Sequence, residues 1–357
     1  MAARLSSIGA ALAAAALVVA VAGPASAAGT GTYTQVNLVS DQPGVAALTD
    51  PSLVNAWGLS HGPNTPVWVS DNGADVTTLY RTDIAGSPVN KVLQVAIPGG
   101  APTGQVFNGT SGFPVPAPGN GQPARFIFAG EDGFISAWNG GASAVQIGGQ
   151  IPGAVYKGLA LVQSPSGPLL LATNFRANRI DAWNSSWTLV STPSMFHDPN
   201  LPAGYAPFNV AEINGQVFVT YALQDAAKHD DVAGKAHGFI DVYTTSGDFV
   251  KRFATHGVLD SPWGIVLAPA SFGQFGGDLL VGNFGDGRIH VFNPSTGAVL
   301  GLLRGTSGGP LVIDGLWGLI VGTQVAGGTS SVWFSAGPDG ESHGLLGLLH
   351  PTSNSQG

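Results

Sequence analysis

Residues 261–292 read SPWGIVLAPASFGQFGGDLLVGNFGDGRIHVF, and this stretch decides the fold. It holds three short β-rich runs separated by glycine, proline, asparagine and aspartate, which are the residues that make turns. The same order of runs, opening on Trp-Gly or a similar pair, recurs in five other parts of the chain. The sequence therefore predicts an all-β repeat protein.

The repeats are evenly spaced. Each one opens around an anchor residue, and the anchors are Gly58, Gly104, Gly158, Asn209, Gly264 and Gly318. Consecutive anchors lie 46, 54, 51, 55 and 54 residues apart. Such an interval holds one four-stranded blade, so the spacing predicts a six-bladed β-propeller. A glycine at the anchor lets the innermost strands crowd near the axis, where side chains have least room.

The two ends of the chain predict how the ring closes. The sixth repeat ends after its third strand at Leu349, whereas YTQVNLV (residues 33–39) is a spare strand near the other end. We expect that spare strand to become the outermost strand of the sixth blade, which removes the open joint of the ring. The propeller is expected to span residues 28–349, with a polar tail at 350–357.

The first 27 residues have the pattern of an export signal. Arg4 precedes a nearly unbroken apolar run from Ile8 to Ala22, and ASA (residues 25–27) fits the small-x-small cleavage rule. The run is short for a membrane-spanning helix, which needs about 20 apolar residues. We therefore predict a signal peptide at residues 1–27, a secreted mature protein, and no membrane anchor after cleavage.

Composition narrows the function classes. The chain has no cysteine and a formal net charge of −8. Disulfides, thiolate metal sites and cysteine nucleophiles are therefore excluded. No run of Lys or Arg offers the basic face that a nucleic acid needs, so we expect no nucleic-acid partner. We expect the mature chain to be a monomer.

The stretch quoted first resembles an NHL repeat. That family reads Pro-x-Gly-hydrophobic, then Val-Ala-Asp, then Asn-x-Arg-Ile-x-Val-Phe, and here Gly282-Asn283 stands in place of Ala-Asp. The mature chain as a whole also resembles an uncharacterised family of exported bacterial proteins. The motifs that carry this second resemblance are NAWG (55–58), WVSDNG (68–73), residues 224–234, VGNFGDG (281–287) and IDGLW (313–317). The resemblance implies a propeller and no particular activity.

One face of such a propeller is the expected binding face. The loops between second and third strands, and those between blades, surround the channel mouth there, and many of the 21 acidic residues fall on them. The candidate ligand-binding residues are Asp71, Asn72, Glu131, Asp132, Asn174, Arg176, Asn209, Asp225, His229, Asp231, Asn283 and Asp286. Asn55, Lys157 and Glu341 fall on the same face.

These residue types are also the ligands that Ca²⁺ prefers, since it takes carboxylate, amide and carbonyl oxygens. The central candidates for a Ca²⁺ or other divalent-cation site are Asp71, Asn174, Asn209 and Asn283, by analogy of fold with the funnel metal sites of propeller lactonases. Asp and Asn also make turns by bonding their own backbone, so a structural role stands beside the metal site.

The fourth repeat has a longer loop after its second strand than the other repeats have. ALQDAAKHDDVAGKAH (residues 222–237) stands where the other repeats turn in far fewer residues. Loops of this length are usually lids, binding loops or disordered segments. His229 and Asp230 are candidates for a catalytic base with its orienting carboxylate, or for metal ligands. The alternative interpretation is a solvated surface loop.

The tryptophans recur at repeat positions. We expect them to pack between blades rather than to form a platform for sugars. They are Trp57, Trp68, Trp138, Trp183, Trp263, Trp317 and Trp333.

Two functions remain open. The first is a secreted recognition protein that binds a protein, peptide, glycan or small molecule on the acidic loop face. The second is a metal-assisted hydrolase or lyase of the propeller lactonase or NHL lyase type, in which an ion polarises a carbonyl. GTSGG (residues 305–309) matches G-x-S-x-G, but it lies in a glycine-rich connection and not between a strand and a helix, as a nucleophilic serine requires.

Overall fold

The computed structural model describes residues 31–83, 88–148 and 151–352. The predicted signal peptide, at residues 1–27, and residues 353–357 of the predicted tail lie outside these ranges. Within them, no helix is long and apolar enough to cross a membrane.

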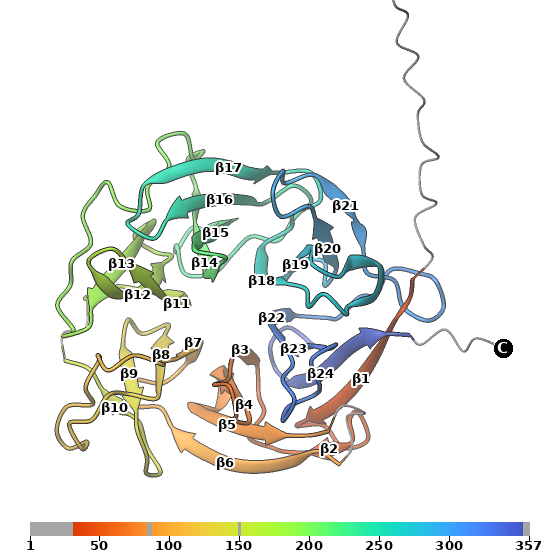
Figure 1. Ribbon diagram of the computed structural model, residues 1–357, viewed down its shortest axis with the longest axis horizontal. Helices are drawn as coiled ribbons and strands as arrows, with labels where there is room; N and C mark the ends of the chain where they lie inside the picture. The colour runs from red at the N-terminus through yellow and green to blue at the C-terminus, as the bar shows by residue number, and fades with distance from the viewer. Residues whose placement is uncertain (1–30, 84–87, 149–150, 353–357) are drawn as a thin grey trace, which may run out of the picture. The chain divides into compact units, whose positions relative to one another are not determined.

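Six antiparallel sheets stand around a central axis (Figure 1), which confirms the six-bladed β-propeller. The innermost strand of each sheet contains the predicted anchor: β3 (Ala56–Ser60), β7 (Pro102–Phe107), β11 (Tyr156–Ser164), β14 (Tyr205–Ile213), β18 (Pro262–Leu267) and β22 (Leu316–Val321). The second strands are β4 (Val67–Asp71), β8 (Phe126–Gly130), β12 (Gly167–Asn174), β15 (Gln216–Leu223), β19 (Leu279–Asn283) and β23 (Val332–Ala336).

The third strands are β5 (Val76–Arg81), β9 (Ile135–Trp138), β13 (Arg179–Asn184), β16 (Phe239–Thr244), β20 (Ile289–Phe292) and β24 (Leu345–Pro351). The outer strands are β6 (Asn90–Ala96), β10 (Val145–Gln146), β17 (Phe249–Thr255), β21 (Val299–Leu302) and β1 (Tyr33–Ser40). Two short 3₁₀ turns, η1 (Asn72–Ala74) and η2 (Gly273–Phe275), complete the elements.

The third blade differs from the prediction of four strands, because its sheet contains only β11, β12 and β13. In place of an outer strand, Leu189 forms an isolated bridge with Trp183, and Val190 N–H donates to the carbonyl of Ala182. The chain then runs through Pro193, which has no N–H to give to a ladder, so pairing stops early.

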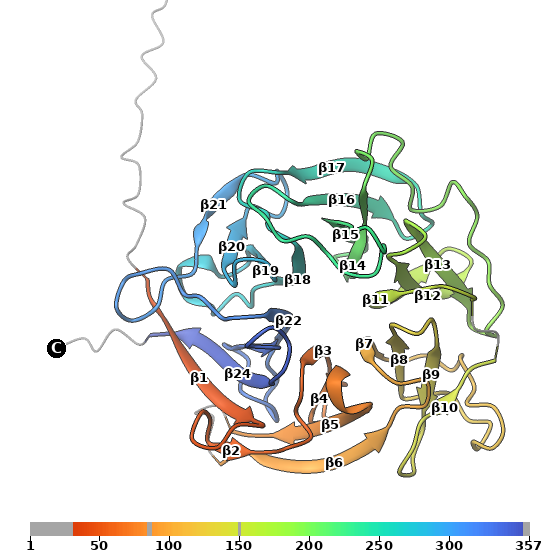
Figure 2. The ribbon, with the colours of Figure 1, turned by 180° about the vertical axis from the view of Figure 1, so that it is seen from behind.

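The ring closes as predicted. β1 pairs antiparallel with β24, with Tyr33 opposite Pro351 and Ser40 opposite Leu345, and Figure 2 shows the two strands side by side at the edge of the last blade. A short strand, β2 (Leu48–Thr49), adds to the outside of β1. Because β24 continues to Pro351, the first two residues of the predicted tail belong to the strand.

Close approach of the inner strands explains the anchoring glycines. A Cβ built on Gly104 would lie 2.3 Å from the backbone N of Leu159 in the next blade, and one on Gly318 would lie 2.7 Å from the carbonyl oxygen of Trp57. Real Cβ atoms do not come so near to backbone, so these strands can meet at this distance only without side chains.

The two faces of the ring carry different loops. On one face, the loop after each second strand bonds the segment that connects two blades: Ile97 N–H donates to Asp75 O, and Phe175 N–H donates to Val155 O, both at 2.9 Å. We call this the mouth face. The opposite face carries the loops between first and second strands and those between third and fourth strands.

Candidate functional site

Aromatic side chains close the central channel beneath the mouth face. Trp317 stacks on Trp57 with ring centroids 3.7 Å apart and on Phe284 at 3.9 Å. Trp263 meets Trp57 at 6.3 Å, and Phe208 lies 5.8 Å from Trp317. Blades 1 and 5, and blades 4 and 6, are not neighbours, so these contacts cross the axis. We call this cluster the aromatic plug.

The plug corrects part of the tryptophan prediction. Trp68 packs between blades as expected, with its ring 3.9 Å from that of Phe126. Trp57, Trp263 and Trp317 instead meet one another at the centre, because they lie at the start of the innermost strands, where the blades are closest.

A buried ammonium group lies directly against the plug. The side chain of Lys157 is 2% exposed, and its Nζ lies 5.1 Å from the centroid of the Trp57 ring. Lys157 forms ion pairs with Glu131 of blade 2 and, at 3.1 Å, with Asp230 of the 222–237 loop. Burial lowers the pKa of Lys157, but the two carboxylates outweigh it and hold the pKa above its usual value. The group therefore stays charged.

A chain of amide hydrogen bonds extends this network toward blade 6. Asn55 accepts a bond from Trp317 Nε1 at 3.0 Å and donates to Glu341 Oε2 at 2.7 Å and to Asn72 Oδ1 at 3.2 Å. Asn72 in turn donates to Glu131 Oε2 at 3.0 Å. Asn55 adopts a left-handed φ of 47°, a conformation that asparagine tolerates better than most residues.

The 222–237 loop supplies the remaining polar groups. Asp225 Oδ1 accepts bonds from the backbone N–H of His229 at 2.8 Å and of Asp230 at 3.3 Å, which folds the loop into a turn. Gln224 donates to the carbonyl of Phe175, and Gly234 N–H donates to Asp260 Oδ1. These bonds tie the loop to blade 3 on one side and to the blade 4–5 connection on the other.

Glu131, His229 and Asp230 form a potential cation-binding cluster, since their ligand atoms all lie within 4.8 Å of one another. His229 Nδ1 lies 2.9 Å from Asp230 Oδ1. Burial raises the pKa of Asp230, but the charge of Lys157 and the bond from His229 outweigh it, so that the pKa is lowered. Burial raises the pKa of Glu341, which lies at the other end of the network.

Three of the four residues predicted as central metal ligands, the asparagines, donate hydrogen bonds to partners of their own. Asn174 donates to Asp181 at 2.8 Å, Asn209 donates to the carbonyl of Trp263 at 2.7 Å, and Asn283 donates to the carbonyl of Val258 at 2.8 Å. Asp71 is fully buried in blade 1, and burial raises its pKa well above the usual value. These contacts do not direct the four side chains toward one ion.

The other predicted residues have separate places on the mouth face. Asp132 is exposed beside Glu131, and Arg176 donates to the carbonyl of Gly153. Asp286 accepts from the backbone N–H of Arg288 and pairs with its guanidinium, both at 3.1 Å. Burial raises the pKa of Asp231, within the 222–237 loop, from 3.8 to about 6. The structure thus brings together Asn72, Glu131, His229 and Asp230 from the predicted set.

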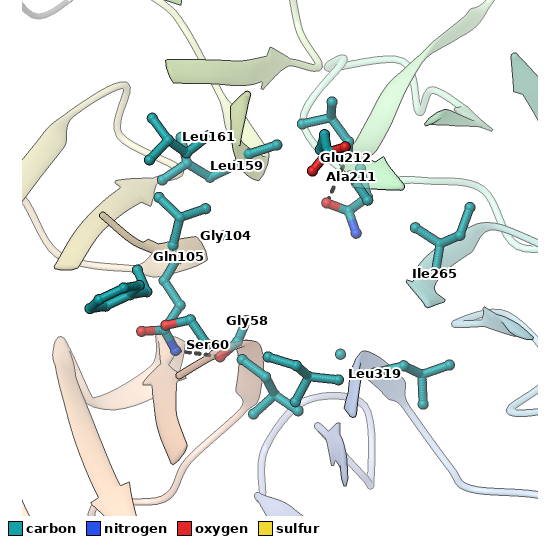
Figure 3. A pocket seen from close by; sticks show the side chains of 18 of the residues that line it. Gly58, Ser60, Gly104, Gln105, Leu159, Leu161, Ala211, Glu212, Ile265 and Leu319 are labelled. Atoms are coloured by element: carbon teal, nitrogen blue, oxygen red, sulfur yellow. Dashed lines mark hydrogen bonds between the residues drawn. The ribbon is translucent and has the colours of Figure 1, made fainter. Parts of the chain in front are cut away.

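Sequence reasoning missed a cavity on the other side of the plug. The channel opens to the opposite face as a space of about 330 Å³ (Figure 3). The residue that follows each anchor contributes to its wall, namely Leu59, Gln105, Leu159, Val210, Ile265 and Leu319. The mostly aliphatic residue after each anchor is the sequence pattern from which this cavity could have been predicted.

Comparison with known proteins identifies viral relatives. No protein-family model matches the chain. It is 32% identical over 333 residues to uncharacterized protein R648 of Acanthamoeba polyphaga mimivirus, with 87% of this chain and 78% of that protein covered. Uncharacterized protein L690 of the same virus is 32% identical over 328 residues, with 87% and 84% covered. The resemblance to bacterial exported proteins stays a prediction.

Solved structures agree with the fold. Virginiamycin B lyase from Staphylococcus aureus has a TM-score of 0.50 at 14% identity, with 90% of this chain and 99% of that chain covered. A catalytically inactive variant of that lyase with quinupristin has a TM-score of 0.51 at 12% identity, with 90% and 99% covered. At these identities the likeness shows a shared fold alone. The chain belongs to the family of the mimivirus proteins R648 and L690, and it folds as a six-bladed β-propeller.

Proposed function

We propose that this protein is a recognition propeller that binds a cationic ligand on its mouth face. The observation that carries the proposal is the buried Lys157, which pairs with Glu131 and Asp230 directly above the aromatic plug. The ammonium group of Lys157 already pairs with Glu131 and Asp230, the two carboxylates that a divalent cation would need as ligands. The stacked rings of the plug also occupy the axis beneath this network. A ligand must therefore bind at the surface.

Charge defines the kind of ligand. The network holds three carboxylates, those of Glu131, Asp230 and Glu341, against the single ammonium of Lys157. The side chain of Asp230 is 65% exposed, so its second oxygen is open to a partner. An excess of negative charge on a surface attracts cationic groups and repels anions. We therefore propose a monomer that binds a basic peptide or protein segment.

Binding of a fluorescein-labelled hexalysine peptide, followed by fluorescence anisotropy, tests this function. We expect the wild-type protein to bind hexalysine, with affinity that falls as salt rises, and not to bind hexaglutamate. The double variant Asp230→Asn/Glu341→Gln should bind about 3- to 10-fold more weakly, since each charge pair at the protein surface contributes up to about 1 kcal/mol.

The control is Glu212→Gln, which removes one exposed carboxylate from the opposite face. It should bind hexalysine like the wild type. Equal binding of hexalysine and hexaglutamate, or wild-type affinity in the double variant, would contradict the proposal.

A metal-assisted hydrolase or lyase is the second candidate. The cluster of Glu131, His229 and Asp230 favours it, since two carboxylates and an imidazole are suitable ligands for Mn²⁺ or Zn²⁺. The structures with the same fold include lyases. A bound ion would supply a Lewis acid that polarises a carbonyl. For that, Lys157 would have to release both carboxylates, while Asn55 and Asn72 would hold Glu131 and Glu341 in place.

We also propose that the protein is exported. This rests on residues 1–27, whose sequence predicts cleavage after Ala27. Mass spectrometry of the protein recovered from the culture medium should give the mass of residues 28–357. Recovery of the uncleaved chain from the cytoplasm alone would contradict export.

A further inference from the structure

A second cavity lies between blades 1 and 2 on the opposite face, away from the mouth. Its volume is about 830 Å³, which is within the range of sites for small molecules. Its apolar wall includes Trp68, Leu79, Leu93, Phe107, Phe126 and Trp138. These residues come from β4, β5, β6, β7, β8 and β9, so the cavity spans the junction of two blades.

The aromatic wall of this cavity is rigid. Trp68 stacks on Phe126 at 3.9 Å, and the ring of Trp138 meets Trp68 edge to face at 4.8 Å. Phe107 meets Phe126 edge to face at 5.5 Å. Trp138 Nε1 donates to the carbonyl of Gly141, which fixes its ring. Such preset aromatic surfaces accept a flat or extended apolar group at small entropic cost.

Two arginines at the same cavity have no partner among the residues that the structure describes. Arg81 at the end of β5 and Arg125 just before β8 are both exposed and both line the cavity. They are the only arginines within residues 31–83, 88–148 and 151–352 whose guanidinium groups make no hydrogen bond or ion pair. The other five are bonded: Arg176, Arg179, Arg252, Arg288 and Arg304.

This arrangement is unusual for an acidic chain. The protein has 21 acidic residues against 13 basic ones, so carboxylates are plentiful. Two unpaired guanidinium groups beside one apolar cavity are complementary to an anion, and arginine binds a carboxylate in a bidentate way.

We infer that this cavity binds a small amphipathic carboxylate. Its apolar body packs on Leu93, Phe107 and Trp138, which are the more exposed apolar residues of the wall, while its acid group pairs with Arg81 and Arg125. The site is independent of the mouth face, because it lies on the other side of the ring and uses the opposite charge.

Isothermal titration calorimetry with 2-naphthoate tests the inference, with 2-naphthalenemethanol as the neutral probe of the same shape. The wild-type protein should bind 2-naphthoate at least 10-fold more tightly than the alcohol. The variant Arg81→Gln/Arg125→Gln should lose that preference and bind the alcohol within about twofold of the wild type. Because the two guanidiniums have no partners, the variant should melt at nearly the same temperature as the wild type.

A matched control and a second variant keep the test independent of folding. Lys228→Gln/Lys235→Gln removes two positive charges, as the double arginine variant does, but from exposed positions on the mouth face. It should leave 2-naphthoate binding unchanged. Leu93→Glu, at a half-exposed position of the wall, gives the arginines a carboxylate of their own and should abolish binding. The inference fails if the wild-type protein does not prefer 2-naphthoate, or if the double arginine variant keeps that preference.

Discussion

At the scale of single residues, Lys157 organises the mouth face. Its ammonium group pairs with two carboxylates from distant parts of the chain. Glu131 lies 26 residues before it in the sequence, and Asp230 lies 73 residues after it. Removal of one partner of a buried pair usually destabilises a protein by about 3–5 kcal/mol, because the remaining charge stays buried. Here Asp230 is largely exposed, so Glu131 accounts for most of the effect.

Lys157→Met should therefore lower the free energy of unfolding by about 2–4 kcal/mol, measured by urea denaturation. Since the variant frees Glu131 and Asp230 beside His229, added Mn²⁺ should restore part of the lost stability. Lys235→Met, at an exposed position, should change neither quantity. No response of Lys157→Met to Mn²⁺ would show that the three ligand atoms cannot hold an ion.

Asp231 makes stability depend on pH. Burial raises its pKa from 3.8 to about 6, so the folded protein favours the protonated form. Its stabilising contribution is fully present below about pH 4 and is lost as pH rises through 6. Asp231→Asn should therefore melt at a higher temperature than the wild type at pH 8, by the equivalent of about 1–3 kcal/mol. The two proteins should melt alike below pH 4, and an equal difference at both pH values would contradict the assignment.

Gly104 tests the packing of the inner strands. Gly104→Ala places a Cβ against the backbone of Leu159 and should destabilise the protein by about 1–3 kcal/mol. Gly305→Ala is the control, since its Cβ would meet open space. Denaturant midpoints compare the two, and equal stability of both variants would refute the close approach.

The residues of the mouth could be predicted from the sequence, but their contacts could not. The sequence predicts Asn72, Glu131 and His229 on this face, because repeat position alone assigns a residue to a face, and it predicts Asp230 as a catalytic or metal-ligand candidate beside His229. Their convergence depends on the path of the 222–237 loop, which Asp225 and Gln224 fix through bonds to backbone groups. The repeat pattern contains no information about such a path. The same limit explains why Asn174 and Asn283 were expected at the centre although each is bonded elsewhere.

At the scale of elements, the outer strands determine how the blades are completed. β1 was predicted to close the sixth blade because the sixth repeat lacked a fourth strand, and the structure confirms it. The third blade was expected to have four strands but has three, since spacing predicts the length of a repeat and not whether its last segment pairs. Repeat spacing also could not show that Trp57, Trp263 and Trp317 meet at the axis.

Leu38 on β1 tests the closure of the ring. It is fully buried and packs with Trp333, Leu346 and Leu348 of the sixth blade. Leu38→Ala should destabilise the protein by about 2–5 kcal/mol, as for other buried leucines. Leu300→Ala, on the outer strand β21 where the side chain is 48% exposed, should cost less than about 1 kcal/mol. Similar urea midpoints for the two variants would mean that β1 contributes little to the ring.

At the scale of the whole molecule, the ring separates two surfaces of opposite character. The mouth face carries an acidic network above a closed channel, whereas the opposite face carries an open channel cavity and the arginine-lined cavity between blades 1 and 2. The relationship to the mimivirus proteins extends over most of the chain, so it concerns the whole propeller and not one blade.

The central claim is that the ammonium group of Lys157 takes the place of a metal ion between the carboxylates of the mouth face. Metal content, combined with thermal melting, tests this claim most directly. Purified wild-type protein should contain no stoichiometric divalent ion, and its melting temperature should be the same in EDTA and in excess Ca²⁺ or Mn²⁺, because the ammonium group of Lys157 already lies between Glu131 and Asp230, where an ion would bind. About one ion per chain, with a large fall in melting temperature in EDTA, would contradict the account and favour the metal-assisted enzyme.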